Sequence, residues 1–128
     1  MSQDEAVQRW LEGADKALRA AKLLHEDGND ELALFDCHLC AEKILKALYI
    51  RDHDCVAPRT HDLAMLVSEL EDLQLQKHFE DFKSMSKLAV AARYDDLEIL
   101  EEELQPARIA HWLSFCTFLL EHAKNQKR

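Results

Sequence analysis

Apolar side chains recur every three or four residues through most of the chain, which is the spacing of α-helices that bury one face. The first such stretch runs from Gln3 to about Glu26, and Gly28 follows where a turn is expected. The second stretch runs from about Glu31 to Asp52. Between Phe35 and Tyr49 its apolar residues fill one broad face, so we expect this segment to be the central helix of the fold.

Further helical segments follow, each with a start or stop signal in the sequence. They are a segment that Thr60 is expected to cap and that runs to about Leu73, then Leu75 to Arg93, a shorter segment from Asp95, and a final segment that follows a kink or restart at Pro106 and ends before the polar residues 124–128. Short loops between helices favour antiparallel neighbours. The sequence therefore predicts an all-α, up-and-down antiparallel bundle of four long helices plus one shorter helix, in a single domain over residues 1–128.

The composition supports this fold class and narrows the cellular environment. The 128 residues include two glycines and two prolines, which leaves almost no punctuation for β-hairpins. No apolar run is long enough to span a membrane, and the first residues are polar and acidic rather than signal-like. With four cysteines in such a chain, we expect reduced thiols and a cytoplasmic protein without membrane contact.

The net charge of −9 limits the partners that the chain can bind. Acidic residues outnumber basic ones in residues 1–57 and above all in 94–106, whereas residues 107–128 are basic. Non-specific binding to duplex DNA depends on many lysines and arginines that displace counterions, so this class of binding is not expected. A local basic pocket for one nucleotide or a short RNA remains compatible with the charge.

A narrow polar stripe runs along the expected central helix beside its apolar face. His38, Glu42 and Lys46 are spaced i, i+4 and i+8, so neighbours can touch, and a glutamate four residues before a lysine favours an ion pair. One interpretation is a solvated or dimer-facing row of salt bridges. The other interpretation is a set of donors and acceptors for a nucleotide, held in place by a rigid helix.

Further cations lie near predicted helix ends. Arg59 and His61 stand at a helix start, where free backbone N–H groups and the helix dipole favour an anion such as phosphate. Asp62 opposes this interpretation, because a carboxylate there can complete the helix cap itself. Arg93 and Tyr94 close the next long helix, where a cation also offsets the dipole.

The cysteines and histidines include a pattern that imitates zinc ligands. Cys37 and Cys40 have the C-x-x-C spacing, and Cys55 and His61 follow. The first two cysteines, however, lie on the apolar face of the expected central helix, where free cysteine packs as a small hydrophobe. We therefore expect packing rather than a metal site, and no cofactor.

Three segments carry a resemblance to a known family: His38–Ala47 (His-Leu-Cys-Ala-Glu-Lys-Ile-Leu-Lys-Ala), Arg59–Leu63 (Arg-Thr-His-Asp-Leu) and Ala92–Asp96 (Ala-Arg-Tyr-Asp-Asp). In order and spacing they resemble the HEPN domain, the higher eukaryote and prokaryote nucleotide-binding domain. The first helix, around Ala14–Ala21, is also similar. The resemblance covers nearly the whole chain and implies an up-and-down helical bundle that is commonly a homodimer.

The resemblance also implies a set of functions. Prokaryotic members stand beside a minimal nucleotidyltransferase in a two-gene module, often of toxin-antitoxin type, and other members bind nucleotides or cleave RNA. The RNA-cleaving branch carries an arginine, a polar residue directly after it, and a histidine four to six residues after the arginine. The pair at such spacing here is Arg19 and His25, but Ala20 follows the arginine, and six helical residues place the two side chains about 240° apart. We therefore expect no catalytic residues; Asp95 also replaces the proline usual after the Arg-Tyr pair.

The sequence thus predicts a non-catalytic HEPN-like module that binds a nucleotide or short RNA, or is docked by a nucleotidyltransferase. The expected contact residues are Lys43, Lys46, Arg59, His61, Arg93 and Tyr94, supported by His38 and Glu42. The lysines and arginines would bind phosphate, and Tyr94 would stack or donate a hydrogen bond. A metal-independent ribonuclease and a pure protein-interaction module are the alternatives.

Overall fold

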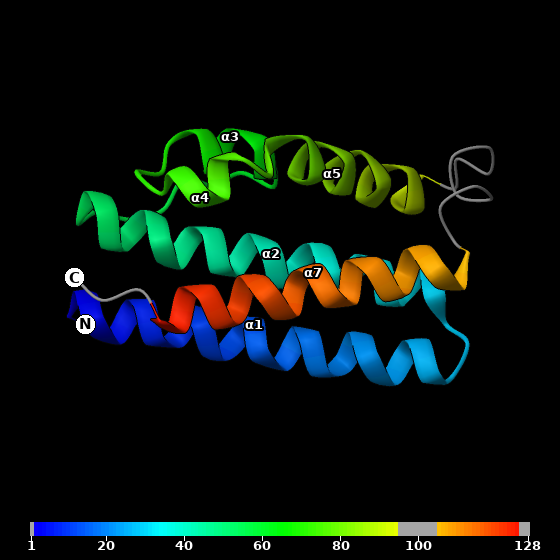
Figure 1. Cartoon of the computed structure of the whole chain (residues 1–128). Helices are drawn as coiled ribbons and strands as arrows, with labels where there is room; N and C mark the ends of the chain where they lie inside the picture. The colour runs from blue at the N-terminus through cyan, green and yellow to red at the C-terminus, as the bar shows by residue number, and fades with distance from the viewer. Residues whose placement is uncertain (1, 95–104, 126–128) are drawn as a thin grey trace.

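The computed structural model describes residues 2–94 and 105–125, and every regular element in these ranges is an α-helix (Figure 1). The elements are α1 (Gln3–Glu26), α2 (Asp30–His53), α3 (Leu63–Ser68), α4 (Leu73–Gln76), α5 (Phe79–Arg93) and α7 (Pro106–Asn125). The predicted all-α class is confirmed. The segment predicted to start at Asp95 lies outside the described residues. None of the described helices combines the length and the apolarity needed to cross a lipid bilayer.

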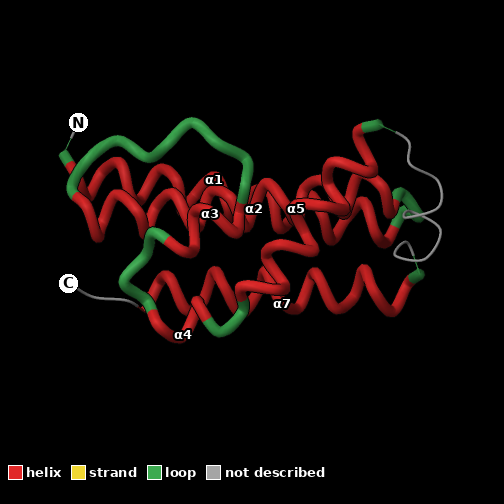
Figure 2. Tube along the Cα trace, turned by 90° about the horizontal axis from the view of Figure 1, so that it is seen from above, coloured by secondary structure: helices red, strands yellow, loops and turns green. Residues whose placement is uncertain are grey.

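The four long helices alternate in direction, as an up-and-down bundle requires. α1 and α2 form an antiparallel pair, α5 runs antiparallel to α2, and α7 returns along α1 and α2 (Figure 1). α1 therefore begins, and α7 ends, at the same end of the molecule (Figure 2). α2 is the central element, as predicted, because it contacts α1, α3, α5 and α7.

Burial explains the central place of α2. The apolar residues on its broad inner face have almost no exposed surface, from Leu34 (0%) near its start to Ile50 (7%) near its end, whereas Phe35 is 37% exposed. Three small residues of α1 are also buried: Ala14, Ala17 and Ala21. Because these side chains are short, α1 can lie close against α2, and this pair forms the largest helix contact of the bundle.

Of the described helices between α2 and α7, α3 and α5 are shorter than predicted. The carboxylate of Asp62 accepts a hydrogen bond from a backbone N–H in the first turn of α3, so Asp62 is the N-cap and the prediction of Thr60 was wrong. α3 ends at Ser68, not near Leu73. At the other end of this region, Pro106 is the first residue of α7, so the proline restarts a helix.

The single helix predicted from Leu75 to Arg93 is divided in two. Asp72 caps the short α4 by accepting a hydrogen bond from Leu75 N (3.1 Å). The backbone N of His78 then donates to Leu75 O in a turn, and α5 begins at Phe79. The helical spacing of apolar residues continues through this turn, and for that reason the pattern did not reveal the break.

The connection 54–62 leads from the end of α2 back along the bundle to the start of α3 (Figure 2). It begins at Asp54, which ends α2 in the left-handed conformation with a φ of 51°. Ala57 is buried within it, whereas Val56 is exposed. This path brings His61 onto the side of α2 that carries the predicted polar stripe.

Candidate functional site

The polar stripe of α2 is buried. His38, Glu42 and Lys46 are only 8%, 5% and 7% exposed, so the interpretation as a solvated row is wrong for this chain. Its salt-bridged character is confirmed, because Lys46 Nζ donates to Glu42 Oε2 at 3.2 Å. Burial of charged groups is costly unless they are paired, so this row must have partners on the elements that cover it.

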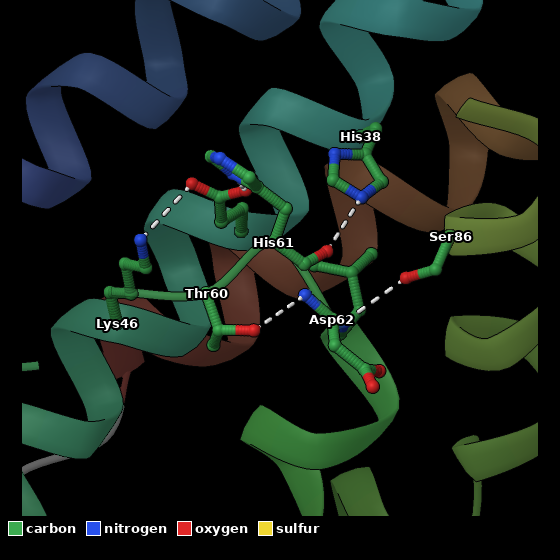
Figure 3. Close-up of polar contacts among 8 residues, drawn as sticks. His38, Lys46, Thr60, His61, Asp62 and Ser86 are labelled. Carbon is green, nitrogen blue, oxygen red and sulfur yellow. Dashed lines mark hydrogen bonds and ion pairs between the residues drawn. The ribbon is translucent and has the colours of Figure 1, made fainter. Parts of the chain in front are cut away.

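His61 is the partner that the connection 54–62 supplies (Figure 3). Its Nδ1 lies 2.7 Å from Glu42 Oε1, so the buried carboxylate is bonded to Lys46 on one oxygen and to His61 on the other. The carbonyl oxygen of His61 accepts a hydrogen bond from His38 Nε2 at 3.1 Å. Since a carbonyl can only accept, Nε2 of His38 carries the hydrogen. Two residues of α2 therefore fix both the backbone and the ring of His61.

The His61 ring is bonded to a buried carboxylate, but most of its side chain remains accessible to solvent. Its side chain is 73% exposed, whereas that of Glu42 is 7% exposed. Because Nδ1 faces the carboxylate, Nε2 is the nitrogen directed to an external group. A fixed and accessible imidazole of this kind can donate to a phosphate or accept a proton from a hydroxyl.

Trp10 of α1 covers the lysines, and the sequence analysis did not include it in the site. The Nζ atoms of Lys43 and Lys46 each lie 5.6 Å from the centroid of its ring, which is within the range of a cation–π contact. Gly13, one turn further along α1, makes room for Lys43: a Cβ there would lie 3.0 Å from Lys43 Nζ and 3.1 Å from its Cδ. Together these residues form what we call the Glu42 cluster: Trp10, His38, Glu42, Lys43, Lys46 and His61.

The remaining predicted residues lie outside this cluster. Arg59 is exposed, two residues before His61, and therefore within about 7 Å of it along the chain. Tyr94 is 76% exposed at the end of α5, where its backbone N donates to Val90 O. The side chain of Arg93 and all of Asp95 lie outside the described residues.

Several backbone N–H groups at the start of α3 already have acceptors within the protein. Asp62 accepts from Met65 N, Ser86 Oγ accepts from Leu63 N at 3.0 Å, and Thr60 Oγ1 accepts from Asp62 N (Figure 3). The structural interpretation, in which Asp62 completes the cap, is therefore confirmed. An anion at Arg59 and His61 would be bound by side chains and not by this helix end.

A cavity of about 410 Å³ opens beside the cluster, between the connection 54–62 and α5. His38 and His61 line one side, and Ser86, Lys87, Ala89 and Val90 line the other. Its volume is within the range of small-molecule sites, about 300–1,000 Å³. His61 therefore borders a space that can hold a ligand.

Comparisons with known proteins identify the family of the chain. The model of the HEPN domain matches residues 7–124, which include every residue of the Glu42 cluster. The chain belongs to the HEPN domain family. The crystal structure of TT1696 from Thermus thermophilus has the same fold, with a TM-score of 0.78 and 22% sequence identity over 92% of this chain and 95% of that one. The comparison with curated proteins found no significant match.

The arginine and histidine at ribonuclease spacing are kept apart in this HEPN domain. Arg19 Nε pairs with Asp15 Oδ2 at 3.2 Å, on the same face of α1. His25 Nδ1 bonds to Asp30 Oδ1 at 2.7 Å, at the start of α2. Each side chain thus has its own acidic partner, and this agrees with the opposed directions expected from their spacing.

The cysteines of α2 pack in the HEPN core, as predicted. Cys37 and Cys40 are fully buried, and Cys116 of α7 donates from Sγ to Cys37 O at 3.3 Å. Hydrogen bonds to the Cys37 and Cys40 thiols, together with burial, raise the pKa of Cys116 well above its ordinary value. Cys55 is exposed on the connection 54–62. Across residues 2–94 and 105–125, no three metal-binding side chains come together.

Proposed function

We propose that this HEPN domain binds a nucleotide or short RNA at the Glu42 cluster. The observation that carries the proposal is the His61 ring, which a buried carboxylate fixes while 73% of the side chain stays exposed beside a cavity. Lys43, Arg59 and Lys87 are cations with exposed surface: Lys43 lies over the Trp10 ring, Arg59 stands two residues before His61, and Lys87 lines the same cavity as His61. Lys46, by contrast, is buried and bonded to Glu42, so its part in the proposal is to hold the carboxylate.

Affinity measurements on charge-removing variants test this proposal. We expect Lys43→Gln combined with Arg59→Ala to weaken binding of a fluorescent nucleotide or short RNA about tenfold or more, because charge-assisted bonds to phosphate contribute about 1.5–3 kcal/mol each. Lys22→Gln, an exposed lysine near the other end of α1, is the matched control. Unchanged affinity in the double variant, measured by anisotropy, would remove the proposed site.

Gly13→Ala gives an independent test that removes no charge. The new methyl group would lie 3.0 Å from Lys43 Nζ and 3.1 Å from its Cδ, so the lysine must shift by a few tenths of an ångström. Alanine is about 1 kcal/mol more favourable than glycine inside a helix, so a weaker affinity cannot be ascribed to unfolding. Arg93→Ala and Tyr94→Phe, assayed in parallel, show whether the end of α5 contributes to the same site.

A second part of the proposal concerns the oligomeric state, the location and the protein partner of the chain. We propose a cytoplasmic homodimer that pairs with a minimal nucleotidyltransferase in a toxin-antitoxin-like module. The support is the family membership and the resemblance of the three sequence segments. Light scattering of the purified chain measures the first point, and co-purification with the product of a neighbouring nucleotidyltransferase gene measures the second. A monomer at micromolar concentration would contradict the dimer.

A second candidate function is metal-independent RNA cleavage, and one observation favours it. The imidazole of His61 and the carboxylate of Glu42 form a hydrogen-bonded pair, the arrangement that orients a general base toward a 2′-hydroxyl. Cleavage of structured RNA in the presence of EDTA should then disappear in His61→Ala and persist in His25→Ala. No cleavage, or cleavage indifferent to both substitutions, would exclude this function.

A further inference from the structure

A second cavity lies at the other end of the connection 54–62. Its volume is about 360 Å³, and its walls include Ala6 and Trp10 of α1, Ile50 of α2, and Val56 and Ala57 of the connection. We call it the Trp10 cavity, and the cavity beside His61 the His61 cavity. Both have the size of small-ligand sites, and the connection borders both.

The Glu42 cluster separates the two cavities along α2. His38 borders the His61 cavity and Ile50 borders the Trp10 cavity, and at a rise of 1.5 Å per residue these positions lie about 18 Å apart along the helix. Glu42, Lys43 and Lys46 lie between them. A single base cannot fill both cavities, whereas the bases of linked nucleotides can.

Trp10 can contact a base of such a ligand, and the lysines can contact its phosphates. The indole borders its cavity and is only partly buried, and nucleobases stack on aromatic rings of this kind irrespective of sequence. The Lys43 ammonium, 5.6 Å from the ring centroid, lies where a phosphate following a stacked base would pass. The His61 cavity offers an apolar wall of Ala89 and Val90 with His61 and Lys87 at its edge.

We infer that the ligand is a single-stranded oligonucleotide, with one base in the Trp10 cavity, another in the His61 cavity, and the intervening phosphates at Lys43 and Arg59. This inference rests on the proposed function and goes beyond it, because it assigns Trp10 as a stacking residue and excludes a mononucleotide as the full ligand. The chain's net charge of −9 agrees with a strand that is gripped locally and not with a duplex held by a broad basic face.

Competition by ligands of increasing length tests the inference. A labelled hexanucleotide is displaced from the full chain by a mononucleotide, a dinucleotide and a tetranucleotide, each as RNA and as DNA. We expect the tetranucleotide to compete at least tenfold more strongly than the mononucleotide. A preference for RNA would add the ribose 2′-hydroxyl to the contacts.

Variants then locate the two bases. Trp10→Leu, and separately Val90→Glu, should each weaken tetranucleotide binding about tenfold, whereas Trp10→Phe, which keeps a ring, should lose less. Val90 is 56% exposed, so its substitution does not disturb the core, and Leu23→Glu, 66% exposed on α1, is the matched control. Circular dichroism confirms that each variant is folded.

The outcomes separate this inference from the proposed function. Equal affinity for mononucleotide and tetranucleotide, still dependent on Lys43 and Arg59, would overturn the two-cavity inference and leave the proposed function intact. Tight tetranucleotide binding that neither Trp10→Leu nor Val90→Glu weakens would also overturn it. Absence of binding at every length would reject both.

Discussion

Two histidines of this domain bond to carboxylates at nearly the same distance and contribute to the molecule in different ways. His61 Nδ1 lies 2.7 Å from Glu42 Oε1, and His122 Nε2 lies 2.6 Å from Asp72 Oδ2. In the first pair the histidine side chain is 73% exposed, whereas in the second both side chains are enclosed, at 9% and 16%. The pair His122–Asp72 therefore connects α7 to the start of α4, whereas His61–Glu42 leaves the histidine side chain accessible, as the proposed binding site requires.

The two carboxylates, Glu42 and Asp72, also differ in their other contacts. Glu42 is enclosed with the ammonium of Lys46, and the two groups form a buried ion pair. Asp72 serves a second purpose, because its other oxygen caps α4. A histidine–carboxylate hydrogen bond can belong to a binding site or can simply connect two helices. The exposure of each partner distinguishes the two cases.

The largest effect is expected when the buried charge of Lys46 loses its partner. Glu42→Ala should lower the free energy of unfolding by about 3–5 kcal/mol, because an uncompensated ammonium would remain in a site that is 9% exposed. Urea denaturation followed by circular dichroism measures this loss. Adding Lys46→Met should restore most of the stability, since an apolar pair replaces a buried ion pair at little cost. A loss below about 1 kcal/mol in the single variant would contradict the account of a tightly paired carboxylate.

The second largest loss of stability is expected when the His122–Asp72 pair at the start of α4 is removed. Asp72→Ala removes both the helix cap and the bond to His122, so we expect a loss of about 2 kcal/mol in the same assay. Asp62→Ala is the matched control, because Asp62 caps α3 without a histidine partner and should cost about 1 kcal/mol. Equal losses in the two variants would show that the His122 bond adds nothing.

The thiol cluster between α2 and α7 predicts a pH dependence. Hydrogen bonds to the Cys37 and Cys40 thiols, together with burial, raise the pKa of Cys116 above its ordinary value of 9.0, so below pH 9 both the folded and the unfolded chain keep the proton. Above pH 9 the unfolded chain releases it first, and the free energy of unfolding should fall as pH rises, by up to about 1.4 kcal/mol per pH unit. Urea titrations between pH 7 and 10.5, with Cys116→Ala as the reference, isolate this slope. Parallel curves would contradict it.

The smallest effect on stability is expected for the exposed histidine. His61→Ala should change the free energy of unfolding by less than about 1 kcal/mol, whereas His122→Ala should cost about 1–2 kcal/mol because its partner is enclosed. Ligand affinity should show the reverse order, with His61→Ala the weaker binder. If both variants lost the same free energy of unfolding, the distinction between the exposed pair at the proposed site and the enclosed pair that connects two helices would be wrong.

The sequence predicted the features that depend on local periodicity. The apolar face of α2, the packing of Cys37 and Cys40, and the ends of α1 near Gln3 and Glu26 all follow from the helical repeat, and the structure agrees. Where two residues could serve as the cap of α3, the sequence selected Thr60, and Asp62 is the cap. The choice depends on the path of the chain before the helix, which a local pattern does not contain.

The site depends on contacts between distant segments. Spacing along α2 predicted the bond between Glu42 and Lys46, but the burial of that pair arises because Trp10 and His61 cover it from α1 and from the connection 54–62. Trp10 carried one signal, its position in the apolar stripe of α1, and that signal is equally typical of an ordinary core residue. The roles of Arg93 and Tyr94 stay predictions.

The central place of α2 has a practical consequence for finding the ligand. α2, the helix with the largest number of buried residues, also carries Glu42, Lys43 and Lys46, so a ligand that binds there is expected to stabilise the folded state. A ligand that binds the folded chain alone, at a hundred times its Kd, raises the free energy of unfolding by about 2.7 kcal/mol. In a domain of this size, such a gain raises the melting temperature by several degrees. Thermal melting of the unlabelled chain can therefore screen oligonucleotides directly.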